Sequence, residues 1–79
     1  MTRYVPRDRL VDFLSRNGFV VGHRCSTDEL WCRGAGVSVT VNVPRDAQLA
    51  EDTVRGILQD AGMSPNDIEQ FVQHHITIA

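Results

Sequence analysis

The sequence lacks long hydrophobic runs: no apolar stretch exceeds three residues, as in FVV at residues 19–21. A transmembrane helix needs about 20 consecutive apolar residues, so the sequence predicts none. The N-terminal segment MTRYVPRDRL also lacks the apolar core of a signal peptide, and we therefore expect the protein to be cytoplasmic. In that compartment its two cysteines, Cys25 and Cys32, are expected to be reduced thiols.

Lysine is absent as well, since all eight basic residues are arginine. Arginine suits bidentate contacts to phosphate, although the codon usage of a GC-rich genome accounts for the same composition. The formal net charge of −2 is unevenly distributed: residues 1–45 carry seven arginines against four acids, and residues 46–79 one arginine against six acids. A polyanionic partner would therefore meet the first half of the chain.

At 79 residues, with 42% hydrophobic and 23% charged residues, the chain has the composition of one globular domain. A domain of this size buries only about 60–65% of the surface of its unfolded chain. Its stability is therefore expected to be modest, unless a second copy adds buried surface in a homodimer.

Hydrophobic periodicity predicts three helices and three strands. The clearest strand is VSVTVNV, in which four valines alternate with polar residues. The helices are expected over 6–17, 50–61 and 65–74, and the strands over 19–24, 29–33 and 37–43. The order α-β-β-β-α-α predicts one α+β domain, residues 1–79, in which helices cover one face of a three-stranded antiparallel sheet.

Small and polar residues mark the ends of these helices. Gly18 and Gly62 can take the left-handed conformation that terminates a helix, and Ser64 can cap the helix that begins at Pro65. Gly56 lies inside the second helix, where it costs about 1 kcal/mol relative to alanine. We therefore expect another element to pack closely against Gly56.

The segment GHRCSTDELWC concentrates residues that could bind a metal. Cys25 and Cys32 are separated by six residues, outside the spacing of a zinc knuckle. Zinc would need these thiols, His23 and a fourth ligand from His74 or His75, and neighbouring residues do not share a helix face. We predict no metal and no cofactor. The default for the two adjacent histidines is a solvated helix end.

The two cysteines could instead be part of a hairpin. If its turn is centred on Asp28-Glu29, Cys25 and Cys32 would form a cross-strand pair that oxidation could bridge. Otherwise they are small, partly buried residues of a hairpin. Trp31, between them, could stack on a nucleic-acid base or anchor a small core or a partner surface.

Short motifs follow one another in a fixed order along residues 7–65. They are Gly18-Phe19 after the first helix, Val43-Pro44-Arg45 after the third strand, then Leu49, Thr53, Ile57-Leu58 and Ala61-Gly62. This ordered series resembles the HicA family of toxins. The resemblance implies a fold like a double-stranded-RNA-binding domain, metal-independent cleavage of messenger RNA by an endoribonuclease, and a HicB-like antitoxin as partner.

The two histidine positions of that family are occupied by aspartate. Its catalytic histidine falls on Asp28, and the histidine of its Val-Pro-x-His segment falls on Asp46. Cleavage through the 2′-hydroxyl needs a base and then an acid near neutral pH. Aspartate has a reference pKa of about 3.9 against about 6.5 for histidine, so it is a much weaker base there. Glu29 could not assist, because neighbouring strand residues point to opposite faces.

The resemblance therefore implies a HicA-like RNA-binding-type domain of a toxin–antitoxin family with impaired catalysis and weak RNA binding. Candidate phosphate contacts are Arg24, Arg33 and Arg45, within or beside the sheet. Two alternatives stay open. His23, near the hairpin tip, could replace the lost base of an active messenger-RNA interferase. The acidic second half of the chain instead favours a protein-interaction module that does not touch nucleic acid.

Overall fold

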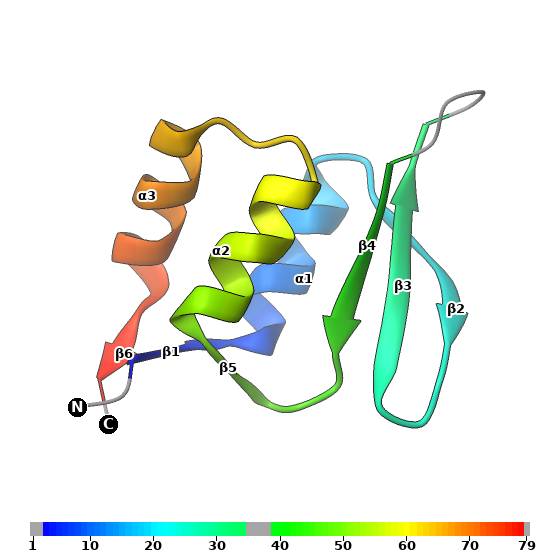
Figure 1. Cartoon of the computed structure of the whole chain (residues 1–79), viewed down its shortest axis with the longest axis horizontal. Helices are drawn as coiled ribbons and strands as arrows, with labels where there is room; N and C mark the ends of the chain where they lie inside the picture. The colour runs from blue at the N-terminus through cyan, green and yellow to red at the C-terminus, as the bar shows by residue number, and fades with distance from the viewer. Residues whose placement is uncertain (1–2, 35–38, 79) are drawn as a thin grey trace.

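The computed structural model describes residues 3–34 and 39–78, which form three helices and two small antiparallel sheets (Figure 1). The elements are β1 (Arg3–Pro6), α1 (Arg7–Arg16), β2 (Val20–Arg24), β3 (Asp28–Arg33), β4 (Val39–Pro44), β5 (Gln48–Ala50), α2 (Glu51–Asp60), α3 (Pro65–His75) and β6 (Thr77–Ile78). The predicted strand over 37–43 thus begins with two residues, 37 and 38, that lie outside the described ranges.

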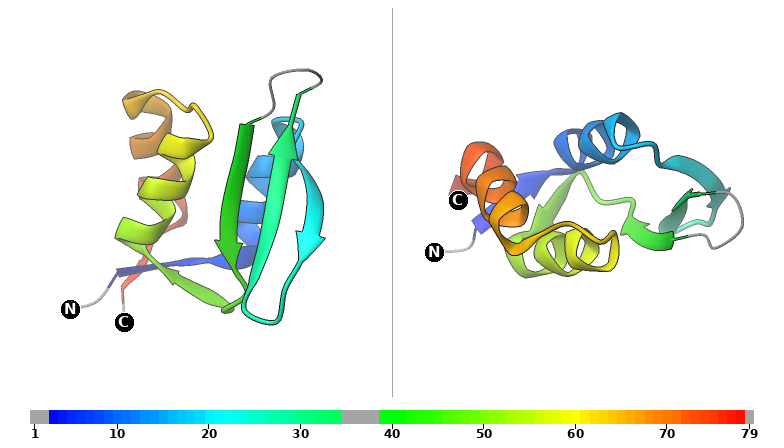
Figure 2. Two further views of the ribbon diagram at one scale, coloured as in Figure 1. Left: turned by 45° about the vertical axis from the view of Figure 1, so that its right-hand side comes forward. Right: turned by 90° about the horizontal axis from the view of Figure 1, so that it is seen from above.

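The larger sheet is antiparallel and has the order β2-β3-β4. The alternation predicted for the valine strand is present in β4, where Val41 and Val43 are buried and Thr40 and Asn42 are exposed. All three helices lie on one side of this sheet, and its other face has no covering element among the described residues (Figures 1 and 2). The expected α+β class and three-stranded antiparallel sheet are confirmed.

A second sheet, with the order β5-β1-β6, was not predicted from the sequence. It is very short: Val5 of β1 pairs with Leu49 of β5, and Tyr4 pairs with Thr77 of β6. Val5 and Leu49 are both buried in the hydrophobic core. This sheet therefore joins the two ends of the chain beneath the helices (Figure 2), and the predicted order α-β-β-β-α-α omitted it.

One hydrophobic core lies between the helices and the two sheets. Its buried members are Val5, Leu10, Leu14, Phe19, Val41, Val43, Leu49, Val54, Ile57, Leu58, Ala61, Ile68, Phe71 and Val72. The side chains of α1, α2 and α3 that enter it recur at helical spacing, which is why these segments fold as amphipathic helices. No helix in the described ranges is long or apolar enough to cross a membrane.

The helix ends form as their residues dictate. Gly18 and Gly62 have φ angles of 88° and 86°, the left-handed region in which glycine terminates a helix without strain. The Ser64 hydroxyl accepts a hydrogen bond of 3.2 Å from the backbone N–H of Asp67. The expectation for Gly56 is wrong, because no atom of another described element lies within 4 Å of the place where its Cβ would be.

Candidate functional site

The most informative surface lies where the β2–β3 hairpin meets the chain leaving β4. The backbone N–H of Cys25 donates to the carbonyl of Asp28 at 2.8 Å and closes the turn. Arg45 then fastens the next segment to it: its backbone N–H donates to Thr27 O at 2.9 Å, and its Nη1 donates to Cys25 O at 3.0 Å. We call this region, residues 24–28 and 44–46, the hairpin end.

Asp28 and Asp46, the two aspartates that the sequence resemblance aligned with histidines, both belong to the hairpin end. Asp28 is the first residue of β3 and pairs with Pro44, and Asp46 follows two residues later in the segment that Arg45 ties to the turn. Their positions were assigned from separate motifs. The fold therefore brings to one end of the sheet two positions that the sequence could connect only through the resemblance.

Asp28 is half-buried and faces away from the core. Its Oδ2 lies 3.5 Å from Asn42 Nδ2 and 3.5 Å from Thr27 Oγ1, which makes both contacts long for hydrogen bonds. No arginine or histidine forms an ion pair with it in the part of the chain that the structure describes. Glu29 points to the opposite face and is buried, as strand alternation predicted.

Glu29 is the centre of an ion-pair network that the sequence did not reveal. Its side chain is only 9% exposed, and its two carboxylate oxygens pair with Arg7 Nη2 and with Arg24 Nε, the latter at 2.8 Å. Arg7 Nε also donates to the carbonyl of Pro44 at 2.8 Å. The network thus connects the start of α1 with β2, β3 and the end of β4, and it holds Arg24 at the hairpin end.

Burial and the two arginines act on the Glu29 carboxyl in opposite directions. Burial raises its pKa, but the hydrogen bonds from Arg7 and Arg24 and the charge of Arg7 outweigh burial, so the pKa lies below the usual 4.5. The Trp31 indole N–H also lowers the pKa. This N–H is buried and makes no hydrogen bond of normal geometry to any described residue, so it acts as a nearby dipole and not as a formed bond.

The three arginines expected to contact phosphate are not brought together. Arg24 and Arg45 lie at the hairpin end, and the Arg24 side chain is 66% exposed although one nitrogen binds Glu29. Arg33 lies at the opposite end of β3. There it donates to Asn17 O at 3.1 Å, and its guanidinium lies 4.8 Å from the centre of the Phe19 ring. Arg33 therefore secures the α1–β2 connection.

His23, the possible substitute base, is exposed on the uncovered face of the larger sheet. It pairs with Leu30 of β3, and Asp28 lies two residues before Leu30 on the same face. His23 and Asp28 are therefore diagonal neighbours, a relation that places Cβ atoms about 7–8 Å apart. Leu30, directly opposite His23, and Val20, at the other end of β2, are exposed by 37% and 62%, so this face also carries exposed apolar side chains.

The cysteines lie far from each other along the hairpin. Cys25 is exposed in the turn, whereas Cys32 is half-buried near the other end of β3 and pairs with Val20. The alternative of a cross-strand cysteine pair is wrong, because the turn spans residues 25–27 and is not centred on Asp28-Glu29. The other interpretation, two partly buried residues of a hairpin, holds for Cys32 but not for the exposed Cys25. Within the described residues, no group of three or more His, Cys, Asp or Glu side chains could hold a metal ion.

The adjacent histidines near the C-terminus follow expectation only in part. His74 and His75 end α3, and both line one groove between α1 and α3. Their rings meet edge to face with centroids 4.7 Å apart. Neighbouring helical residues point about 100° apart, and an imidazole is long enough to reach one groove from either direction. His74 is exposed and His75 is half-buried, so the predicted solvated helix end holds for His74, while His75 also packs on Phe71 with ring centroids 4.6 Å apart.

Comparison of the chain with protein-family models, with curated proteins and with solved structures gave no match. The hairpin end, with two exposed arginines around two aspartates, is accordingly the feature from which a function is inferred.

Proposed function

We propose that this protein is a HicA-like RNA-binding-type domain of a toxin–antitoxin family whose catalysis is impaired. The observation that supports the proposal is the hairpin end, where Asp28 and Asp46 lie on segments joined to Arg24 and Arg45; the sequence resemblance aligns these two aspartates with histidines. The proposal includes a fold similar to that of a double-stranded-RNA-binding domain and a cytoplasmic location. A HicB-like antitoxin would be its partner.

Arg24 and Arg45 supply the binding chemistry in this proposal. A guanidinium has five N–H donors, and Arg24 uses Nε on Glu29 while Arg45 uses Nη1 on Cys25 O. Each therefore keeps donors for a phosphate oxygen, and its local bond fixes the direction of the side chain. Charge-assisted contacts from a pre-positioned guanidinium are the strong kind of phosphate contact.

The two aspartates weaken both the binding and the cleavage of RNA. Asp28 and Asp46 are anionic side chains at the place where phosphate would arrive, so they oppose binding by repulsion. A carboxylate that stays ionised also cannot donate the proton that the leaving oxygen needs. The expected result is an RNA ligand that is held weakly and left intact.

Incubation of the purified protein with labelled single-stranded messenger RNA tests both parts. We expect binding at low salt without cleavage, and weaker binding by Arg24→Gln and Arg45→Gln. Arg16→Gln is a suitable control, because Arg16 is exposed on α1 and pairs only with Asp12 among the described residues. No binding at low salt, or equal binding by all three variants, would contradict the proposal.

A second candidate function is an active, metal-independent endoribonuclease that uses His23 as base. The observation in its favour is the diagonal relation of His23 and Asp28 on the uncovered face, because an aspartate beside a histidine can orient the imidazole and stabilise its charged form. This candidate predicts growth arrest on expression and RNA fragments with cyclic ends. Both effects should be lost in His23→Gln and strongly reduced in Asp28→Asn. Intact RNA after incubation with the wild-type protein would exclude it.

A further inference from the structure

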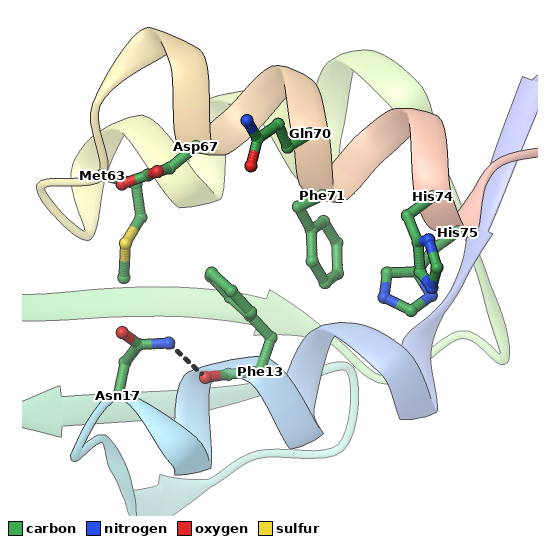
Figure 3. A pocket seen from close by; sticks show the side chains of 8 residues that line it. All are labelled: Phe13, Asn17, Met63, Asp67, Gln70, Phe71, His74 and His75. Carbon is green, nitrogen blue, oxygen red and sulfur yellow. Dashed lines mark hydrogen bonds between the residues drawn. The ribbon is translucent and has the colours of Figure 1, made fainter.

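A groove between α1 and α3 lies away from the hairpin end and has no part in the function proposed above. Its volume is about 510 Å³. Phe13 of α1 and Phe71 of α3 point toward each other inside it, Met63 closes one end, and His74 and His75 lie at the other (Figure 3). The groove therefore has an apolar middle and a basic end.

Four rings connect these two parts without interruption. The centroids of Phe13 and Phe71 are 4.7 Å apart, those of Phe71 and His75 are 4.6 Å apart, and those of His75 and His74 are 4.7 Å apart. The apolar middle and the imidazoles are thus separated by only one or two ring spacings. A ligand that used both would need its apolar group close to its polar group.

The basic end continues into a second hollow of about 400 Å³, which Arg9 lines together with both histidines. Arg9 is exposed and forms no ion pair with a described residue. The nearby carboxylate of Asp12 is already bound to Arg16 at 3.0 Å. Three basic side chains, one from α1 and two from α3, therefore lie together here, and no described carboxylate forms an ion pair with them.

Burial and the neighbouring charges together lower the pKa of His75. Burial lowers its pKa first, the charges of His74 and Arg9 lower it further, and Asp12 opposes them weakly. The remaining acid of the groove, Asp67, belongs to the first turn of α3, at the end away from the histidines. An anion placed among Arg9, His74 and His75 would favour the charged imidazoles.

We propose that this groove docks an acidic peptide segment of a partner protein. An apolar side chain of the segment would cover Phe13 and Phe71, and a carboxylate beside it would pair with Arg9 and the histidines. The open shape along two helices suits a peptide, and the unbalanced positive charge selects an acidic one by complementarity. In an extended peptide, the side chains on one face belong to every second residue and are about 6.6 Å apart along the chain. An apolar side chain and a carboxylate two residues away therefore fit the one or two ring spacings of 4.6–4.7 Å between the phenylalanines and the imidazoles.

A six-residue acidic peptide with leucine and phenylalanine at its centre is the probe. In a titration followed by NMR, we expect it to shift the ring signals of His74 and His75 and to raise the pKa of His75. Because the bound carboxylate favours the charged imidazole, binding should be at least fivefold tighter at pH 5.5 than at pH 8. Binding of equal strength at both pH values would overturn the proposal.

Two further peptides and three variants separate this docking mode from less specific binding. A peptide with lysines in place of the glutamates, and an acidic one with serine and glycine at its centre, should both bind much more weakly. Arg9→Gln should weaken binding at both pH values, and His75→Gln should reduce the pH dependence. Arg24→Gln, at the distant hairpin end, should leave peptide binding unchanged.

Besides equal binding at both pH values, two results contradict the docking of an acidic peptide. One is equal binding of the lysine peptide, and the other is displacement of the acidic probe by an RNA oligonucleotide, which would assign the groove to nucleic acid. Arg9 is exposed and forms no ion pair with a described residue, so we expect the Arg9→Gln variant to fold. The test can therefore be decided with Arg9→Gln even if the His75→Gln variant does not fold. Failure of this proposal would leave RNA binding at the hairpin end unaffected.

Discussion

Glu29 lies on β3, but its two partners come from other elements: Arg7 opens α1 and Arg24 ends β2. A carboxylate in a largely buried position loses hydration, and only compensating charges and hydrogen bonds make that position favourable. Arg7 and Arg24 supply both. The lowered pKa of Glu29 means that the folded state stabilises the ionised carboxylate better than the unfolded chain does.

The first prediction concerns Glu29→Gln. Hydrogen bonds to charged groups contribute about 1.5–3 kcal/mol each, and exposure of Arg24 reduces its share, so we expect a loss of about 2 kcal/mol at pH 7. Because the folded pKa lies below 4.5, the stabilisation is present above the unfolded pKa and is lost as the pH falls through the folded pKa. The deficit of the variant should therefore shrink as the pH falls below the unfolded pKa of about 4.3.

Urea unfolding of both proteins at pH 7 and at about pH 3.5, below the unfolded pKa, measures this difference. Asp28→Asn is the matched control, because it removes one carboxylate on the neighbouring residue that faces away from the core. Its effect should stay within about 0.5 kcal/mol at pH 7, as is usual for surface substitutions. A deficit of Glu29→Gln that persists unchanged at the lower pH would show that the glutamine acts through packing and not through lost charge.

At the scale of the elements, α2 and its end offer a comparison between two glycines with equal free space. Apart from the adjoining backbone, no described atom lies within 4 Å of a Cβ at Gly56 or at Gly62, but of these two only Gly62 has a positive φ angle, 86°. Gly56→Ala should therefore stabilise the protein by about 0.5–1 kcal/mol, the difference in helix propensity. Gly62→Ala should destabilise it by about 1 kcal/mol, the cost of a left-handed residue with a Cβ.

Thermal unfolding measures both substitutions under one set of conditions. Since free space is the same at the two sites, opposite signs can come only from backbone conformation. If Gly56→Ala were destabilising, the surroundings of Gly56 would have to be more crowded than the structure shows. Gly56 is the only glycine within α2, so it is the position of this helix at which alanine gains most in helix propensity.

The sequence predicted the elements whose signals are local. Gly18, Gly62 and Ser64 mark helix ends through their own φ angles and hydrogen bonds, and the alternating valines of β4 need no distant partner to indicate a strand. β1, β5 and β6 could not be found in this way. They contain two to four residues each, and the Val5–Leu49 pairing that stabilises two of them exists only once the chain has folded.

In the candidate site, too, the sequence predicted what depends on local pattern and missed contacts between residues far apart in the chain. Strand alternation correctly placed Asp28 and Glu29 on opposite faces. The partner of Glu29 on α1, Arg7, is remote in sequence and carries no motif, so the network that holds Arg24 stayed hidden. The same limitation grouped Arg33 with Arg24 and Arg45, although the length of β3 separates it from them.

Over the whole molecule, the acidic second half of the chain is partly neutralised by its own contacts. Arg55 binds Glu51 at 2.8 Å and Glu69 at 2.7 Å, linking α2 to α3. Hydrogen bonds from Arg55 come first among the causes that hold the pKa values of Glu51 and Glu69 below their usual value. These acids therefore stay ionised but paired, while the exposed guanidinium of Arg24 faces solvent at the hairpin end.

This distribution predicts how RNA binding depends on salt. Each phosphate that a protein neutralises on a single strand contributes about −0.7 to the slope of log affinity against log salt concentration. If Arg24 and Arg45 are the two contacts, the slope should be about −1.4. Arg24→Gln and Arg45→Gln should each bring it to about −0.7, because each removes one released counterion.

Arg33→Gln is the decisive comparison for that slope. It removes the same charge from the same sheet, but Arg33 lies at the other end of β3 and is engaged with Asn17 and Phe19. We expect the slope measured by fluorescence anisotropy to stay at about −1.4 for this variant, while its stability decreases. If the slope became equally shallow, about −0.7, for all three variants, RNA binding would depend on the total charge of the first half of the chain and not on a site at the hairpin end.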